Sequence, residues 1–171
     1  LRTSIRSKGL TLFMEPKALY SSPQSEAIVP DDFEVPFGKA RIRKEGKDIT
    51  LLTYGNTTPM SMEVAQKLAG EGKGDVEVID LRSLIPLDRE TIFNSVKKTN
   101  KVLIVHEDKV FSGFGAELSA MLADELFEHL DAPIRRVGSP FTPVGFNRIL
   151  ENAILPNSER IEKAVTELLG F

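Results

Sequence analysis

Three consecutive polar residues, His106, Glu107 and Asp108, follow a short apolar run and are the side chains best suited to chemistry. A histidine at the end of a strand can shuttle protons near neutral pH, and a neighbouring carboxylate would hold its charge. Adjacent residues of a strand point to opposite faces, so Glu107 need not meet His106. The favoured interpretation is structural, with His106 hydrogen-bonded to a loop. A ligand-binding or supporting role for His106 and Glu107 is the alternative.

A glycine-containing turn follows these polar residues. The run Val102–Val105 predicts a buried strand, and the apolar spacing from Phe114 to Leu126 predicts a helix after Gly113 and Gly115. Strand, polar corner, turn and helix make half of a βαβ unit, in which ligands usually sit at the carboxyl end of the strand. A dinucleotide fingerprint is disfavoured because Leu118 replaces its third glycine and the acidic corner would repel a pyrophosphate. A tight turn with close helix packing is predicted instead.

Strand-like and helix-like segments alternate over the rest of the chain. Further strands are predicted at 40–44, 49–54, 76–81 and 134–137, and further helices from 57, at 89–98 with Asp88 as its cap, at 147–152 and from 158. Thr57 or Thr58 is expected to cap the first of these helices. The alternation predicts an α/β fold with a mostly parallel sheet covered by helices on both faces. The short spacing between 40–44 and 49–54 predicts a hairpin, which would add one antiparallel edge.

The first 37 residues lack this regular pattern. They read as a short helix, then a strand over Leu10–Met14, then a stretch containing Pro23, Pro30 and Pro36. A long irregular stretch is unusual inside one compact domain but normal between two. We therefore expect 1–20 to be the tail of a preceding domain, 21–37 a linker and 38–171 the main domain. The missing initiator Met suggests a fragment or a processed piece.

The composition is that of an ordinary soluble globular protein. The 171 residues are 41% apolar and 27% charged, with a net charge of −3, so a nucleic-acid partner is not expected. The absence of cysteine excludes disulfides, thiolate metal sites and a cysteine nucleophile, and two histidines are too few for a structural zinc site. No apolar run approaches the ~20 residues of a membrane span, and no signal peptide is seen.

A group of acidic residues lies late in the chain, comprising Asp124, Glu125, Glu128 and Asp131, to which the terminal carboxylate of Phe171 adds a charge. A solvated helix surface is the default explanation, and His129 beside it is expected to be a surface group. The alternative is an acidic patch that receives a basic partner domain.

Taken together, the motifs resemble the C-terminal part of the β subunit of the E1 component of thiamine-diphosphate-dependent 2-oxo acid dehydrogenases. The branched-chain (2-oxoisovalerate) type is favoured over the pyruvate type. The resemblance rests on FMEPKALY (13–20), VPFGKARIRKEGKDITLLTYG (35–55), VEVIDLRSLIPLDRETIFNSVKKT (76–99), VLIVHED (102–108), GFGAEL (113–118) and DAPIRRV (131–137). The chain departs from the family at Phe141-Thr142-Pro143, where the family usually has Asp-Thr-Pro, and this departure predicts a different arrangement of the 139–147 loop.

The resemblance implies a fold and a cofactor. Residues 38–171 would be a transketolase C-terminal domain, a three-layer sandwich with a mixed five-stranded sheet, one antiparallel edge strand and helices on both faces. Residues 1–20 would end the pyrimidine-binding domain. The full-length enzyme would use thiamine diphosphate and magnesium. None is expected on this piece, which lacks the upstream glutamate and continues Gly74-Asp75 with Val76 instead of the diphosphate signature.

The resemblance also implies partners. The chain would contribute to a homodimer, assemble with an E1 α subunit or a fused α part, and dock the subunit-binding domain of the lipoyl acyltransferase (E2) through Asp131 and Phe171. It would serve oxidative decarboxylation of a 2-oxo acid, in the bacterial cytoplasm or the mitochondrial matrix, without being catalytic alone. The alternatives are a regulatory small-molecule-binding module and the equivalent domain of pyruvate dehydrogenase, transketolase or another thiamine enzyme.

Overall fold

One five-stranded sheet organises the protein. A computed structural model describes residues 1–26 and 28–171. The strands, in the spatial order β1-β3-β2-β4-β5, are β1 (Arg41–Lys44), β3 (Val76–Asp80), β2 (Ile49–Thr53), β4 (Val102–Lys109) and β5 (Arg135–Ser139). All neighbouring pairs are parallel except β1 with β3, which is antiparallel. The predicted mixed, mostly parallel sheet with one antiparallel edge is confirmed.

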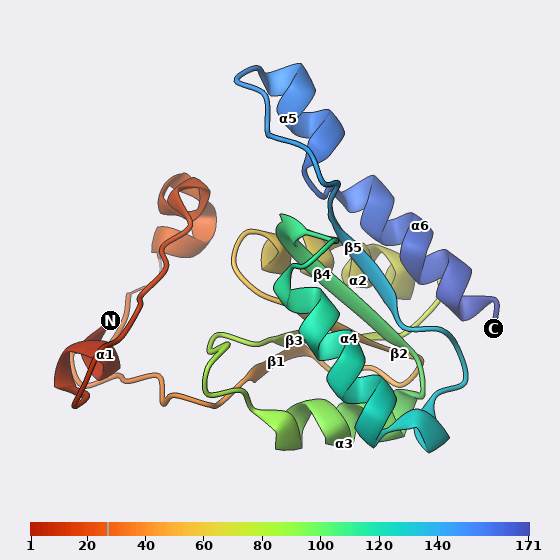
Figure 1. Cartoon of the computed structure of the whole chain (residues 1–171), viewed down its shortest axis with the longest axis horizontal. Coiled ribbons are helices and arrows are strands. Elements are labelled where there is room, and N and C mark those ends of the chain that lie inside the picture. The colour runs from red at the N-terminus through yellow and green to blue at the C-terminus, as the bar shows by residue number, and fades with distance from the viewer. Residues whose placement is uncertain (27) are drawn as a thin grey trace.

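Helices cover both faces of this sheet, as expected (Figure 1). On one face lie α2 (Thr57–Gly70) and α6 (Ser158–Leu169), and on the other lie α3 (Arg89–Thr99) and α4 (Phe114–Glu125). Each face has its own apolar core. Ile49 and Leu51 of β2 point into the first core and Leu52 into the second, because successive side chains of a strand alternate between faces. All five residues of β2 are buried, as befits the central strand of a covered sheet.

The predicted hairpin between the first two strands is wrong. β1 pairs with β3, with Arg41 opposite Asp80, and not with β2. A βαβ crossover through α2 places β3 on one side of β2, and β4 occupies the other side, so β1 pairs at the outer edge of β3 instead. β1 is an exposed edge strand carrying Arg41, Arg43 and Lys44, and such charges discourage further strand pairing.

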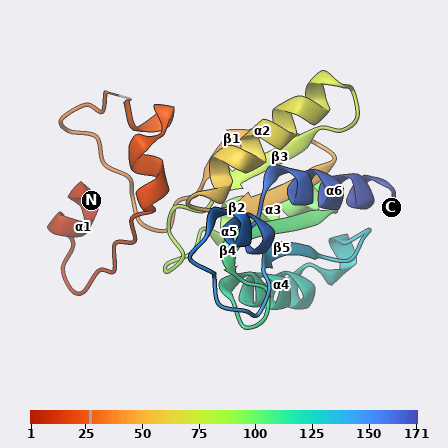
Figure 2. The same cartoon turned by 90° about the horizontal axis from the view of Figure 1, so that it is seen from above.

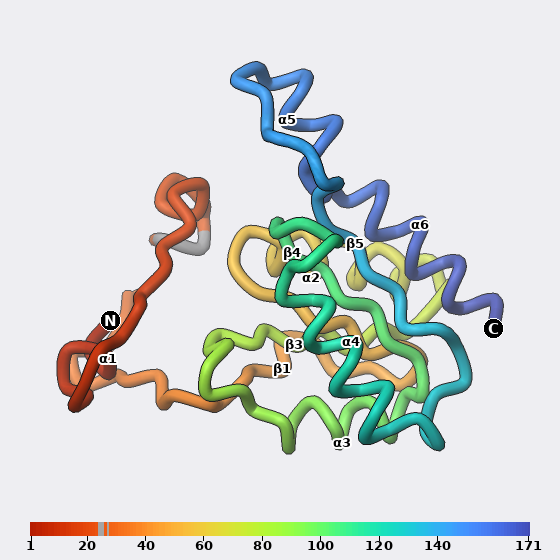
Figure 3. Tube along the Cα trace, in the orientation of Figure 1, coloured from red at the N-terminus to blue at the C-terminus, as the bar shows by residue number. Residues whose placement is uncertain are grey.

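Residues before the sheet form small separate pieces (Figure 3). These are α1 (Arg2–Arg6) and two 3-10 helices, Lys17–Ser21 and Pro23–Glu26. The predicted strand Leu10–Met14 is wrong, because that stretch is irregular and its side chains are largely exposed. It finds no neighbouring strand among the described residues, and a lone strand is not stable. The division into 1–20, 21–37 and 38–171 stays a prediction, and Ala27 of the linker lies outside the described residues.

A side chain caps the start of three α-helices in the described part of the chain. Asp88 caps α3 as predicted, its carboxylate accepting a hydrogen bond from the Thr91 amide at 3.2 Å. The expected threonine cap of α2 is wrong, because Asn56 occupies the cap position. The Thr57 hydroxyl instead donates backwards to the Tyr54 carbonyl at 2.9 Å.

After β5 the chain leaves the body of the molecule. It forms a loop and then α5 (Arg148–Ile154), which stands clear of the sheet before the chain returns through α6 to the C-terminus (Figure 1). Within 1–26 and 28–171, none of the helices has the length and apolarity to cross a membrane.

Candidate functional site

The order of the strands predicts a site at the carboxyl ends of β2 and β4. From β2 the chain crosses to β3 on one side, whereas β4 leads to β5 on the other, so the strand order reverses between β2 and β4. Ligands of open α/β sheets bind outside the carboxyl ends of the strands at such a reversal. The residues found there are Tyr54 and Asn56 after β2, and His106, Glu107 and Asp108 in β4. We call these five residues the corner.

The two carboxylates of the corner are engaged in holding it together. The Asn56 side-chain amide donates to Glu107 Oε2 at 2.9 Å, which ties the end of β2 to β4. The Ser139 hydroxyl of β5 donates to the Glu107 carbonyl at 2.7 Å. Asp108 accepts from the amides of Lys109 at 2.7 Å and Phe114 at 3.4 Å, at the start of α4. The corner thus connects the end of β4 to the end of β2, to β5 and to the start of α4.

His106 is completely buried behind this joint. A Cβ placed on Gly115 would fall 2.2 Å from His106 Nε2, and one on Gly138 would fall 3.1 Å from Cε1. Glycines of α4 and β5 therefore make room for the imidazole on two sides. Neither ring nitrogen makes a well-formed hydrogen bond among the described residues, and the backbone that acts on the ring is that of Asp108 in the same strand, so the expected hydrogen bond to a loop is not found. Burial lowers the pKa of His106, and the charge and backbone of Asp108 oppose that effect.

Tyr54 completes the packing of the histidine. Its ring stacks on the imidazole with centroids 6.1 Å apart and an angle of 13° between the planes, and it meets Phe114 edge-on at 6.2 Å. Burial, followed by the charges of Asp108 and Glu107, raises the pKa of Tyr54 to about 12. The phenol therefore keeps its proton, and the imidazole favours its neutral form. Among the five corner residues, the only charged groups are therefore the carboxylates of Glu107 and Asp108, and both already accept hydrogen bonds.

The glycine turn before α4 serves the same packing. A Cβ on Gly113 would lie 2.0 Å from the Lys109 carbonyl oxygen, so the turn closes too tightly for any side chain. This geometry agrees with the predicted tight turn and close helix packing. Sequence reasoning missed Tyr54 and Asn56, whose only signal was their position directly after a buried strand.

A second place brings two predicted site residues together. Asp131 and Phe171, 40 positions apart in the chain, both line one open hollow of about 470 Å³. Its floor and walls are mostly apolar, and the remaining lining residues are Ser119, Ala123, Phe127, Leu130, Ala132, Pro133 and Ile134. Phe127 and Phe171 are 75% and 60% exposed, so two aromatic rings stand open to a partner.

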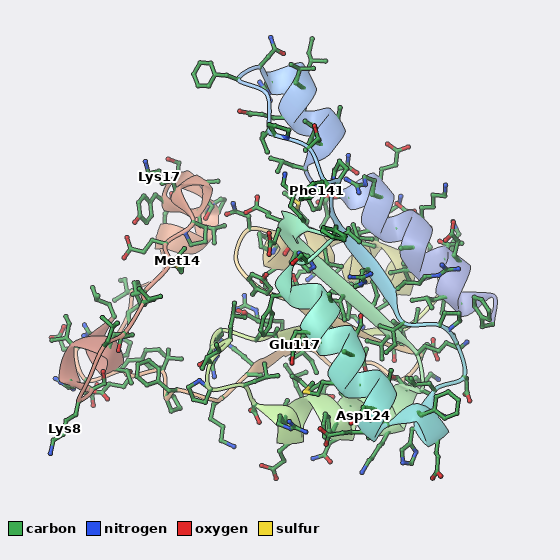
Figure 4. All side chains as sticks on the ribbon, viewed as in Figure 1. Lys8, Met14, Lys17, Glu117, Asp124 and Phe141 are labelled. Atoms are coloured by element: carbon green, nitrogen blue, oxygen red, sulfur yellow. The ribbon has the colours of Figure 1, made fainter. Side chains whose placement is uncertain are left out.

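The acidic residues around this hollow are not all available. Glu125 forms an ion pair with Arg89 across α3 and α4, whereas Asp124 and Glu128 are exposed (Figure 4 labels Asp124 at the end of α4). Asp131 accepts from the Asn100 side-chain amide at 3.2 Å and stays exposed. Asp131 also lines a neighbouring polar hollow that contains lysines 47, 73 and 101. The negative side of the apolar hollow is therefore the one near Asp124 and Glu128. His129 is exposed, as expected.

The residues that begin like a diphosphate signature do not fit a cofactor site. Asp75 forms an ion pair with Lys44 at 2.8 Å, and its amide donates to Asp48 at 2.8 Å. Gly74 lies against Leu169 of α6, where a Cβ would come within 2.7 Å of the leucine side chain. Both residues precede β3 and so lie at the amino ends of the parallel strands, whereas the corner lies at their carboxyl ends. Gly74 and Asp75 therefore serve packing and ion pairing within the domain, and their contacts do not fit a magnesium–diphosphate site.

Comparison with known proteins places this fold. The family described as "Transketolase, C-terminal domain" matches residues 38–161. The β subunit of acetoin:2,6-dichlorophenolindophenol oxidoreductase from Bacillus subtilis is 38% identical over 99% of this chain and 49% of its own length. From Dictyostelium discoideum, the mitochondrial 2-oxoisovalerate dehydrogenase subunit beta is 43% identical, and the mitochondrial pyruvate dehydrogenase E1 component subunit beta is 39% identical. Each comparison covers 96% of this chain, with 45% and 46% of the relatives.

A solved structure gives the same answer. A split-gene transketolase, described as an inactive β4 tetramer, superposes with a TM-score of 0.70 and 28% identity over 84% of this chain and 45% of that one. The chain spans about half the length of the curated relatives it matches. These relatives do not single out the branched-chain type, because the pyruvate, acetoin and branched-chain proteins are all similar to this chain.

Proposed function

Because the chain belongs to the transketolase C-terminal domain family, we propose that it is the C-terminal domain of the E1 β subunit of a 2-oxo acid dehydrogenase. In this proposal it serves subunit assembly and docks the lipoyl acyltransferase during oxidative decarboxylation of a 2-oxo acid. The names of the relatives support an oxidoreductase subunit of this kind and leave pyruvate and branched-chain substrates equally open. The whole enzyme would use thiamine diphosphate, with magnesium as its metal partner.

The domain itself would not be catalytic in this proposal. The corner offers a buried imidazole without a well-formed hydrogen bond among the described residues, a phenol with a raised pKa, and two carboxylates already engaged. A general base must reach the proton that it abstracts, which these groups do not do. The corner would therefore support the shape of the domain, and the thiamine-dependent step would take place in other parts of the protein.

The observation that carries the docking role is the apolar hollow lined by Asp131 and Phe171. Exposed aromatic rings suit the apolar centre of an interface, and exposed carboxylates nearby suit its charged rim. The subunit-binding domain of the acyltransferase is expected to be basic, so the charges would be complementary. Partners in the proposal are this acyltransferase, an E1 α subunit and a second β subunit. The compartment would be the mitochondrial matrix or the bacterial cytoplasm.

Calorimetric titration of the chain with the isolated subunit-binding domain tests the docking role. Phe171→Ala and Asp131→Asn should each weaken binding several-fold, and the affinity should fall as salt is added. Glu159→Gln removes a similar charge from the exposed start of α6 and serves as the control. Equal affinities for all four proteins would reject the hollow as the docking site.

A regulatory binding module is the less favoured function. Its natural place would be the corner, but Glu107 and Asp108 give that edge negative charge, which opposes anionic effectors such as nucleotides and acyl-CoAs. A thermal-shift screen with these compounds and with 2-oxo acids tests it. A shift that disappears in Asn56→Ala would favour the regulatory function over docking.

A further inference from the structure

His106 lies beneath the first turn of α4, at the edge of the sheet where ligands of such folds bind. Its imidazole is completely buried, and neither ring nitrogen makes a well-formed hydrogen bond among the described residues. Burial of a polar group without good hydrogen bonds costs free energy, because the group loses its hydration. A local opening that admitted water to the imidazole would recover part of this cost.

The segment that covers the imidazole is weakly built. It comprises residues 111–117, which end with the first turn of α4, and we call it the cover segment. Gly113 stands at the cap position of α4 without a side-chain hydrogen bond, whereas side chains cap α3 and α6. Ser112 has a φ of 61°, in the left-handed region that residues other than glycine rarely adopt. The hydrogen bond from the Phe114 amide to Asp108 is long, at 3.4 Å. Opening of the cover segment would therefore release strain and break few strong contacts.

Both ends of the cover segment are anchored. Before it, the Val110 amide donates to the Ser139 carbonyl at 2.9 Å, and Arg136 donates to the Val110 carbonyl at 2.8 Å. After it, Leu118 of α4 is buried in the apolar core. The cover segment can therefore move between two fixed points while the sheet and the rest of α4 stay folded.

An arm made by residues 140–155, which contain α5, also holds the cover segment. The arm stands clear of the sheet in Figure 1, and seen from above in Figure 2 it lies over the body of the domain. At its base, labelled in Figure 4, the Phe141 ring meets the Phe111 ring edge-on, with centroids 5.2 Å apart and planes at 69°. Beside this contact, the Lys109 ammonium donates to the Thr142 carbonyl at 2.6 Å. These two contacts join the arm to the beginning of the cover segment.

The two ends of the arm are tied to each other. Arg160 of α6 donates to the Gly138 carbonyl, before the arm, at 2.7 Å. The same guanidinium donates to the carbonyls of residues 154–155, at the end of the arm, at 3.1 and 3.2 Å. Because one side chain joins both ends, a displacement moves the arm as a unit and withdraws Phe141 from Phe111. Both rings are largely exposed, so a molecule that contacts the arm also reaches this ring pair.

We propose that residues 111–117 are a lid over His106 and that the arm latches the lid shut through the contact of Phe141 with Phe111. When the arm moves, the lid opens between its two anchored ends and exposes the imidazole at the carboxyl end of β4. The arm thus controls the access of small polar molecules to this edge of the sheet, a role separate from docking at the apolar hollow. Phe141 is where the chain departs from the Asp-Thr-Pro run of the family that it resembles, so the resemblance does not imply this latch.

Carbethoxylation of the histidines by diethyl pyrocarbonate near neutral pH, followed for each peptide by mass spectrometry, tests the lid. His129 is exposed and is the reference within the same chain. In the unchanged chain His129 should react rapidly and His106 far more slowly. Phe141→Asp removes the ring contact and should raise the His106 rate several-fold while the His129 rate stays the same. Phe146→Asp makes the same replacement at a fully exposed position of the arm and should change neither rate.

Two further measurements separate the latch from a general loss of stability. Phe111→Ala should raise the His106 rate as Phe141→Asp does, and the two replacements together should raise it little further, because they break one contact. Urea below the unfolding transition should leave the His106 rate nearly constant, since a local opening exposes little surface.

Three results would overturn the proposal. If His106 reacts as fast as His129 in the unchanged chain, nothing covers it. If Phe141→Asp and Phe146→Asp give equal His106 rates, the arm is not a latch. If the His106 rate rises steeply with urea, the imidazole is exposed by global unfolding and not by a lid. Acyltransferase binding is a separate measurement, so its loss or persistence bears on the proposed function alone.

Discussion

Gly115 lies so close to His106 that a Cβ at position 115 would fall 2.2 Å from the imidazole Nε2. The glycine belongs to the first turn of α4 and the histidine to β4, so the contact sets how closely this helix approaches the sheet. Both residues are buried. The pair is thus a packing unit at the edge where catalytic residues of α/β proteins are often found.

Gly115→Ala should therefore destabilise the fold. Alanine is normally better than glycine inside a helix, but here its methyl group would force the helix away from a buried ring, at a cost of about 1–3 kcal/mol. Urea denaturation followed by circular dichroism measures the free energy of unfolding. Gly70→Ala is the control, because a Cβ at that helical position meets nothing within 4 Å. Equal midpoints for the two variants would contradict the packing role of Gly115.

Burial of His106 should make stability depend on pH. Because burial lowers its pKa below the ordinary value of 6.5, the unfolded chain binds more protons than the folded one below that pH. The free energy of unfolding should therefore fall as the pH drops from about 6.5 to 5, a range above the titration of most carboxylates. His106→Phe should flatten this part of the profile, whatever its effect on absolute stability. His129→Gln, at the exposed second histidine, should leave the slope unchanged.

The sequence predicted correctly those features that depend on interactions between residues near one another in the chain. The cap at Asp88, the alternation of strands and helices and the glycine turn all depend on residues near one another in the chain. The pairing of β1 with β3 could not be predicted in this way. That pairing depends on β3 lying beside β2, which leaves the outer edge of β3 for β1. Gly46, in the connection between β1 and β2, packs on the start of β3 so closely that a Cβ would lie 2.3 Å from the Glu77 amide nitrogen.

The candidate sites also depend on contacts between residues that are distant in the chain. The burial of His106 requires Gly115 and Gly138 from two other elements, which the run around the histidine does not reveal. Asp131 and Phe171 were selected for their charge and their likeness to a family, and the fold brings both to one hollow. Their role in docking stays a prediction.

The ion pair between Glu77 and Lys98 provides a third test. Glu77 of β3 is buried, and burial alone would raise its pKa, but the hydrogen-bonded ion pair with Lys98 prevails and lowers it. Lys98→Met leaves a buried carboxylate without its cation and should cost roughly 1–3 kcal/mol, a figure kept modest because water reaches the half-exposed lysine.

The double variant Glu77→Gln with Lys98→Met should recover part of this loss, because a neutral amide needs no cation. Lys97→Met removes an equivalent charge from the exposed neighbouring position and should change the free energy of unfolding little. Thermal and urea unfolding of the unchanged chain, Glu77→Gln, Lys98→Met and the double variant complete a double-mutant cycle. A Lys98→Met protein as stable as Lys97→Met would show that the pair contributes nothing.

The cap of α3 gives the last test, because Asp88 joins two distant parts of the fold. Its carboxylate accepts from the Thr91 hydroxyl at 2.8 Å and from the Ala40 amide at 2.9 Å, so it starts α3 and also fixes the chain entering β1. Asp88→Ala should cost about 2 kcal/mol, at the upper end for a helix cap, because the Ala40 amide also loses its acceptor. Asp88→Asn keeps an acceptor oxygen and should lose less.

Acid should remove the same contribution in the unchanged protein. Burial of Asp88 is outweighed by its hydrogen bonds to Ala40 and Thr91 and by the charge of Lys39, so its pKa is lowered from 3.8. The stabilisation is complete above that value and is lost as the pH falls through the lowered pKa. Unfolding measured from pH 5 downward should show a smaller loss in Asp88→Asn than in the unchanged chain. Parallel profiles for the two proteins would mean that Asp88 does not hold its charge through these contacts.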